Sequence, residues 1–249
     1  MDISVVIPTA DRGKLLARAL LSVASQTHQP SEVLVVDNGK SDAEPFDNKI
    51  LNLKTIKTAP MIGPSAARNI GWKAATGKLV AFLDDDDFWF DDYLELCLSR
   101  ACQVSRSGNH DLPIVVSQLQ RLDNNGIPKP YKLFPTNKKD QRKVYFSNPG
   151  FGGQNIVIPK YILEALNGFD ETMPASVDRD FAARALQNNF EIVVANTAVS
   201  VLCDHPGDRV RANQVLGNKR FIQKHWHKMS PAELFKAINI YLSRKKRNR

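Results

Sequence analysis

Apolar segments of strand length alternate with apolar residues at helical spacing in the first ninety residues. Four segments predict strands: Ile3–Ile7, Glu32–Val36, Leu51–Ile56 and Leu79–Leu83. After the first segment, Leu16, Leu20 and Val23 recur at helical spacing, and Asp11 is the expected N-cap of that helix. A second helix is expected to begin at Pro64. Strands that alternate with helices in this way predict a parallel sheet covered on both faces.

The second half of the chain has a less regular pattern. Strands are expected at Ile114–Gln120, Asn155–Ile158, Ile192–Val194 and Val199–Leu202. Helices are expected at Asp91–Cys102, Tyr161–Leu166 and Phe181–Leu186. Two more helices follow in the tail, and Ser230 and Glu233 form a capping box for the second. The predicted fold class is α/β: a single domain with a mostly parallel, Rossmann-like sheet flanked by helices, and a C-terminal helical tail.

Composition fits this picture and bears on the cellular compartment. The chain has 249 residues, of which 43% are hydrophobic, enough for one large α/β domain. No segment approaches the roughly 18 uninterrupted apolar residues of a membrane span. The N-terminus does not resemble a signal peptide. The three cysteines, Cys97, Cys102 and Cys203, have no CxxC spacing. We therefore expect a cytoplasmic protein with reduced thiols.

Positive charge is concentrated at the C-terminus. The formal net charge is +8. Five of these charges come from Arg244, Lys245, Lys246, Arg247 and Arg249. Without them the charge falls from +8 to an ordinary +3, and no nucleic-acid partner is expected. Four apolar residues precede them on one expected helix face: Leu234, Ile238, Tyr241 and Leu242. This end of the chain is either a solvated tail or a segment that binds peripherally to the inner surface of an anionic membrane.

Polar residues follow three of the predicted strands. Thr9 follows the first strand, Asp37 the second, and Asp84–Asp87 the strand at Leu79–Leu83. Ligands of open α/β sheets bind outside the carboxyl ends of the strands. The sequence therefore brings these residues to one edge of the sheet, where we expect a ligand site.

The acidic run itself needs a neutralising partner. Each pair of like charges about 4 Å apart costs about 1 kcal/mol in water, and more at a lower dielectric constant. A following helix N-terminus could provide that partner, which would make the run a solvated cap. A divalent cation, Mn²⁺ or Mg²⁺, held by one or two carboxylates plus substrate phosphates, is the other possibility. The convergence with Thr9 and Asp37 favours the cation.

Three segments resemble the family 2 glycosyltransferases of the GT-A fold. They are VVIPTADRGKLLARALLSVASQT with PSEVLVVDNGKSD, then GPSAARNIGWKAATGKLVAFLDDDDFW, and finally GFDE with DRDFAAR. Together they span roughly residues 3 to 187 in the family's order. The resemblance implies a GT-A domain over residues 1–209 and a helical basic tail over 210–249. It divides the domain into a nucleotide-binding half, about 1–100, and an acceptor-binding half, 101–209.

The resemblance also implies roles for single residues. Thr9 would contact the nucleotide, Asp37 would accept the N3–H of uracil or thymine, and Arg68 would bind the nucleotide and diphosphate. Asp84, Asp86 and Asp87 match the family's LDxDD pattern, with Asp86 the expected metal ligand. The implied donor-binding residues are Thr9, Asp37, Arg68, Asp84 and Asp85, and the metal ligands are Asp86 and Asp87. Asp178 matches the catalytic base.

The chain departs from the family's pattern at several positions. Asn38 and Val177 replace acids of two paired motifs, and Asp85 replaces the small middle residue of the metal motif. The extra acid creates two overlapping DxD registers, and the sequence does not decide between them.

Several candidates keep a second interpretation. Thr9 and Asp37 could be strand-end caps, and Arg68 could pair with an acid of its helix. The glycine-rich loop Gly150–Gly153, with Gln154 and Asn155, could shape the sugar pocket or be an ordinary turn.

Asp178 could instead cap its helix, and Asp180 is expected to pair with Arg184 at i+4. His205, in a loop, is a further candidate for the metal or the diphosphate, although a lone loop histidine is more often neither.

The predicted function is that of an inverting glycosyltransferase. It would move a sugar from a nucleotide-diphosphate donor, with UDP favoured, to an acceptor hydroxyl on a growing glycan, lipid-linked saccharide or other acceptor. One alternative is a degenerate GT-A domain that serves as a nucleotide-sugar or glycan-binding subunit. A sugar nucleotidyltransferase or a dehydrogenase would want a glycine-rich turn where this chain has Pro8-Thr9-Ala10.

Overall fold

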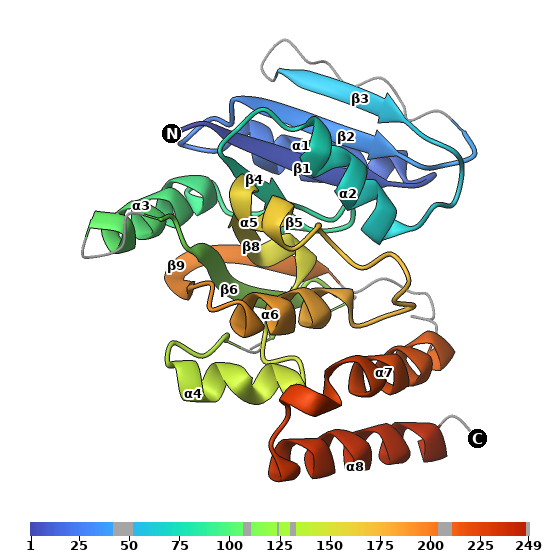
Figure 1. Ribbon diagram of the computed structural model, residues 1–249. Helices are drawn as coiled ribbons and strands as arrows, with labels where there is room; N and C mark the ends of the chain where they lie inside the picture. The colour runs from blue at the N-terminus through green and yellow to red at the C-terminus, as the bar shows by residue number, and fades with distance from the viewer. Residues whose placement is uncertain (42–51, 107–110, 124, 130–132, 204–210, 248–249) are drawn as a thin grey trace.

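The structure is a computed structural model that describes residues 1–41, 52–106, 111–123, 125–129, 133–203 and 211–247. Nine strands of this described part form one sheet (Figure 1). Their order is β3-β2-β1-β4-β8-β6-β9-β5, and β7 pairs with β6. The strand bounds are β1 Ile3–Thr9, β2 Glu32–Asp37, β3 Leu53–Lys57, β4 Leu79–Phe82, β5 Phe88–Trp89, β6 Ile114–Leu122, β7 Pro128–Lys129, β8 Ile156–Pro159 and β9 Ile192–Cys203.

The N-terminal half of the sheet is parallel, as the continuous apolar runs predict. β2 and β4 both pair with β1 in parallel, and β3 pairs with β2 in parallel. All seven residues of β1 are buried, which fits a central strand covered on both faces. β8 is antiparallel to β4 and β6, and β5 is antiparallel to β9, so the sheet is mixed beyond β4.

Helices cover the two faces of the sheet over two separate cores. The helix bounds are α1 Gly13–Ala24, α2 Pro64–Ala74, α3 Tyr93–Arg106, α4 Lys138–Gln141, α5 Lys160–Ala165, α6 Val177–Gln187, α7 Arg211–His225 and α8 Pro231–Arg247. Alternate residues of β1 divide between the cores. Val6 packs with residues of α2 and α6, while Val5 and Ile7 pack with residues of α1 and α3. The predicted fold class is confirmed by this layered arrangement.

Two local predictions are wrong. Asp11 is not the N-cap of α1, because Arg12 holds that position. Asp11 instead has a left-handed backbone, and its carboxylate accepts hydrogen bonds from the backbone N–H groups of Lys40 and Ser41. The two strands expected at Ile192–Val194 and Val199–Leu202 form one strand, β9, whose pairing with β6 shifts register between Ser117 and Gln118.

The tail folds against the domain as α7 and α8, joined by a short 3₁₀ turn at Trp226–Lys228 (Figure 1). The expected capping box is present. The backbone N–H of Ser230 donates to Glu233 at 2.7 Å, and the backbone N–H of Glu233 donates to the Ser230 hydroxyl at 3.3 Å. None of the helices in the described ranges combines the length and the apolar character that a membrane crossing requires.

Candidate active site

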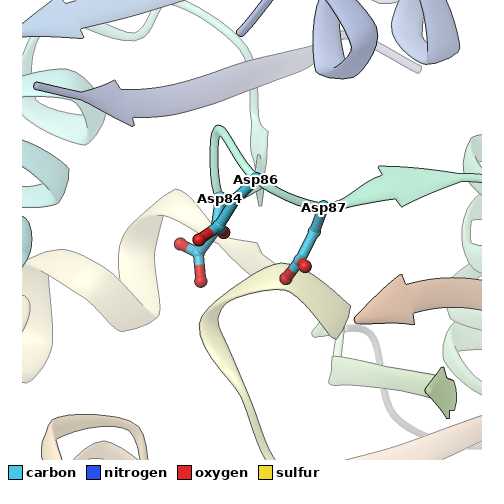
Figure 2. A group of neighbouring side chains, drawn as sticks. All are labelled: Asp84, Asp86 and Asp87. Carbon is cyan, nitrogen blue, oxygen red and sulfur yellow. The ribbon is translucent and has the colours of Figure 1, made fainter. Parts of the chain in front are cut away.

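The acidic run forms the loop between β4 and β5, at the carboxyl edge of the parallel strands. Figure 2 shows Asp84, Asp86 and Asp87 leaving this loop with their carboxylates on the same side. One carboxylate oxygen from each of the three lies within 4.8 Å of the others. Three convergent carboxylates are the oxygen ligands that Mg²⁺ and Mn²⁺ prefer. The geometry therefore fits a divalent cation, and it groups the same three residues that match the LDxDD pattern.

Asp85 lies apart from this group. Its side chain turns toward the loop after β1, where the Thr9 hydroxyl donates to it at 2.7 Å. The Arg12 guanidinium is 3.2 Å from Asp85 and 2.9 Å from Asp86. Burial raises the pKa of Asp85, while the hydrogen bond from Thr9 and the charge of Arg12 act in the opposite direction. Thr9 and Arg12 thus offset part of the cost of burying the fourth acid.

Arg68 links the acidic loop to α6. Its guanidinium, carried by α2, is buried and bonds to Asp84. The same group lies 4.0 Å from the Oδ1 atom of Asp178. Gly153 makes room for it, because a Cβ atom at that position would come 2.5 Å from the Arg68 Nη2 atom. The loop at Gly150–Gly153 therefore packs directly against the arginine.

Asp178 stands in the first turn of α6 and is only partly compensated. Its side chain is 30% exposed, but its Oδ1 atom is buried and makes no hydrogen bond within the described residues. Burial raises the pKa of Asp178, the nearby Arg68 opposes that shift, and the charge of Asp84 adds to it. A carboxyl group with a raised pKa beside an arginine has the character of a general base.

A cavity of about 470 Å³ opens at this edge of the sheet. Its walls are made by Pro8, Thr9, Ala10, Asp11, Arg12, Asn38, Met61, Pro64, Arg68, Asp84, Asp85 and Asp86. The cavity brings together five residues that the sequence nominated. Asp178 is not in the wall itself but lies next to Arg68 behind it. Arg12 and Met61 are wall residues that sequence reasoning missed. A basic residue three positions after a strand end, as Arg12 is after Thr9, was the only signal.

Of the neighbours Asp37 and Asn38, the residue at the cavity wall is Asn38. The Asp37 carboxylate is buried, and it accepts from the Lys57 ammonium and from the Gly39 backbone N–H, each at 2.9 Å. Asn38 reaches the cavity wall, and its side-chain amide donates to the Thr9 carbonyl at 2.8 Å. The role of Asp37 in binding a base stays a prediction.

Four further candidates are each placed differently. Asp87 accepts a hydrogen bond from the backbone N–H of Cys203 at 2.9 Å. Asn155, directly after Gly150–Gly153, is fully buried, and its side-chain amide donates to the Ser117 carbonyl of β6, so it has a structural role. His205 lies outside the described residues. The expected pair of Asp180 and Arg184 is confirmed, at 2.8 Å.

Comparison with known proteins agrees with this site. The model of glycosyl transferase family 2 matches residues 4–166. The amylovoran biosynthesis glycosyltransferase AmsB of Erwinia amylovora is 26% identical, over 78% of this chain and 67% of that protein. The glucosyltransferase WfgD of Escherichia coli is 26% identical, over 65% and 61%. An uncharacterized glycosyltransferase of Rickettsia conorii is 41% identical, but over only 39% of this chain and 16% of that protein.

Because the family model matches well over half of its length, the chain belongs to glycosyl transferase family 2. A solved structure of S. aureus TarS with UDP-GlcNAc has a TM-score of 0.70 and 21% identity, and the match covers 98% of this chain and 72% of that one. At that identity the likeness establishes the fold, which is GT-A. The family resemblance predicted from the motifs is confirmed.

Proposed function

We propose that the chain is an inverting glycosyltransferase that uses a nucleotide-diphosphate sugar, with a UDP-sugar the favoured donor. Two comparisons support the nucleotide. TarS was solved with UDP-GlcNAc and with UDP. WfgD is named for the donor UDP-Glc. The cavity beside Thr9, Arg68 and the acidic loop is where this donor would bind.

The observation that carries the proposal is the placement of Asp178. It lies 4.0 Å from Arg68, which also bonds to Asp84, and its Oδ1 atom is buried without a hydrogen bond among the described residues. An unsatisfied buried oxygen is costly unless a ligand completes it. An acceptor hydroxyl would supply the missing donor. This supports a role for Asp178 in proton removal over a role as a helix cap.

We assign the donor-binding and metal-binding roles to separate residues. Asp84, Asp86 and Asp87 would hold Mg²⁺ or Mn²⁺, which when bound supplies neutralisation of the charge that develops on the leaving diphosphate. Arg68 is buried and charged, and it would bind the diphosphate at a low local dielectric, where such contacts are strong. Thr9 and Asn38 would orient the nucleotide at the cavity wall.

Asp178 would act on the acceptor. Its carboxylate takes the proton of the acceptor hydroxyl while that oxygen forms a bond to the anomeric carbon. The bond from the anomeric carbon to the phosphate oxygen breaks on the opposite face, and the electron pair leaves with the nucleoside diphosphate. A single displacement of this kind inverts the anomeric configuration.

The names of two relatives support a proposal for the acceptor class. WfgD is named for an acceptor in which GlcNAc is linked to diphosphoundecaprenol, and AmsB for biosynthesis of the polysaccharide amylovoran. We infer an acceptor hydroxyl on a growing glycan or a lipid-linked saccharide. A cytoplasmic enzyme at the inner membrane surface would suit the second kind.

Substitution of Asp178 tests the proposal. Asp178→Asn keeps the shape but removes the base, so transfer should fall by about 10² to 10⁴-fold. The measurement is UDP release from a panel of UDP-sugars with Mn²⁺ and acceptor, alongside donor binding by thermal shift. Asp123→Asn, in a turn between β6 and β7, is the matched control and should keep full activity. Donor binding without any turnover in the wild type would instead identify a binding subunit.

A further inference from the structure

Helix α8 has two different faces. Ala237 is buried, and Leu234 and Tyr241 are half-buried against the domain. Phe235, Ile238 and Leu242 are exposed. The four residues of the expected apolar face therefore differ in exposure, because Leu234 and Tyr241 are half-buried while Ile238 and Leu242 are exposed.

The outer face is an uncovered apolar stripe. Phe235 is 67% exposed, Ile238 40% and Leu242 45%. Their spacing of i, i+3 and i+7 aligns them along one side of an α-helix. Single exposed apolar residues are ordinary, but three in line on one helix form a patch that indicates a binding surface.

Positive charge continues this stripe. Lys245 and Lys246 follow Leu242 by three and four residues, so they stand one turn further along the same side. Both are exposed, as is Arg247. Arg244 is exposed as well, but it is near enough to the domain that its charge adds to the effect of burial in lowering the pKa of Arg179. Arg249 lies outside the described residues.

The helix is firmly attached to the domain. Glu233 accepts two hydrogen bonds from the Arg142 guanidinium, at 2.7 and 2.8 Å. Lys236 lies over the ring of Phe146, 5.0 Å from its centroid. The stripe is therefore presented in a fixed orientation relative to the candidate active site, rather than on a loose tail.

We propose that the outer face of α8 binds an anionic lipid bilayer, with Phe235, Ile238 and Leu242 inserted at the interface and Lys245 and Lys246 on the headgroups. An apolar stripe bordered by lysines is the pattern of a helix that lies in a membrane surface. Glu233, the one acid of α8, is occupied by Arg142. A second copy would therefore offer this face apolar contact but no complementary charge. The surface would bring the proposed transferase to a lipid-linked acceptor, although the binding itself does not depend on transfer.

Vesicle flotation with the full chain tests the proposal. Wild type should bind vesicles of phosphatidylcholine with phosphatidylglycerol, and should not bind phosphatidylcholine alone. The triple variant F235S/I238S/L242S should lower the partition coefficient at least on the order of 10-fold. The double variant K245Q/K246Q should also lower it on the order of 10-fold, and added salt should weaken the wild type in the same way.

Matched controls separate the stripe from general effects. L21S/F90S removes two exposed apolar residues elsewhere on the surface, and K73Q/K78Q removes two exposed lysines from the other end of the domain. Both should bind vesicles within about twofold of wild type. Thermal melts check folding of every variant, and UDP release with a soluble acceptor should stay unchanged, which keeps this test distinct from the proposed chemistry.

Three outcomes would overturn the proposal. Wild type could fail to bind anionic vesicles, or the α8 variants could bind as well as wild type. Sedimentation could also show a dimer that F235S/I238S/L242S abolishes, which would identify the stripe as a contact between copies.

Discussion

Asp178 and Asp180 lie two residues apart on α6 and have opposite electrostatic surroundings. Asp180 is fully buried and meets three cationic or ring-nitrogen partners, Arg184, Lys224 and His225, each at 2.8 Å. These contacts hold the pKa of Asp180 well below its usual range, although burial acts in the opposite direction. The pKa of Asp178 is raised instead, because burial outweighs the attraction of Arg68.

The difference separates a structural carboxylate from the one that we propose as the catalytic base. Asp180 ties α6 to α7 through Lys224 and His225, and therefore attaches the tail to the domain. Asp178 keeps an unsatisfied oxygen beside the cavity. One helix turn thus carries a fully satisfied acid that stabilises the fold and a partly satisfied acid that is available for chemistry. A cost in stability at a functional position is common in enzymes, which supports the proposed role of Asp178.

The largest expected difference between Asp178 and Asp180 is in their contribution to the free energy of unfolding. Asp180→Asn removes the buried carboxylate that Arg184, Lys224 and His225 share and should lower the free energy of unfolding by about 3–5 kcal/mol. Asp178→Asn mimics the neutral form that the fold favours, so it should leave the free energy of unfolding unchanged or slightly higher. Urea unfolding at pH 7 measures both. Equal losses from the two variants would contradict the distinction.

The acidic loop offers a second pair for comparison. Asp86→Asn removes a carboxylate of the proposed metal site and should weaken Mn²⁺ binding by at least about 10-fold. Asp85→Asn removes a carboxylate that faces Thr9 and Arg12, so Mn²⁺ affinity should change by less than about threefold. Titration calorimetry without donor gives both constants. If Asp85→Asn proves the more damaging change, the metal uses the other DxD register.

The two α6 carboxylates also predict separate responses to pH. Asp178 must be deprotonated to act, so kcat/KM should fall about tenfold per pH unit once the pH drops below its raised pKa. The depressed pKa of Asp180 contributes stability that is present above its unfolded value and is lost only as pH falls through the folded one. A mildly acidic range should therefore exist in which activity is lost reversibly while circular dichroism is unchanged. Unfolding that coincides with inactivation would refute this.

Sequence reasoning succeeded where one local pattern determines the outcome. Continuous apolar runs predicted β1, β2 and β4, because strands covered on both faces have no polar alternation. The i+4 spacing predicted the contact of Asp180 with Arg184. The meeting of Thr9 with the acidic loop also followed, since parallel strands end at one edge.

Sequence reasoning failed where the contacting residues are distant from each other in the sequence. Lys224 and His225 approach Asp180 only because α7 packs on α6, and no spacing rule encodes that contact. Lys57 forms an ion pair with Asp37, because β3 pairs with β2 in a register that aligns the two residues. Asp11 was expected to cap α1, but the left-handed backbone at that position turns its carboxylate toward Lys40 and Ser41.

Arg12 provides the smallest and most selective test of the site. Its side chain is 51% exposed, and it bonds to Asp85 and Asp86 at the cavity wall. Exposure and screening limit such a pair to roughly 1 kcal/mol, so Arg12→Gln should change binding constants by less than about tenfold.

The affinity for Mn²⁺ and the affinity for the donor should change in opposite directions in Arg12→Gln. Mn²⁺ should bind more tightly without donor, because a competing cation is gone, while the donor KM should rise, because a charge near the diphosphate is lost. Lys14→Gln, an exposed change on α1, is the control and should alter neither. Weaker binding of both ligands by Arg12→Gln would show instead that the arginine only shapes the loop.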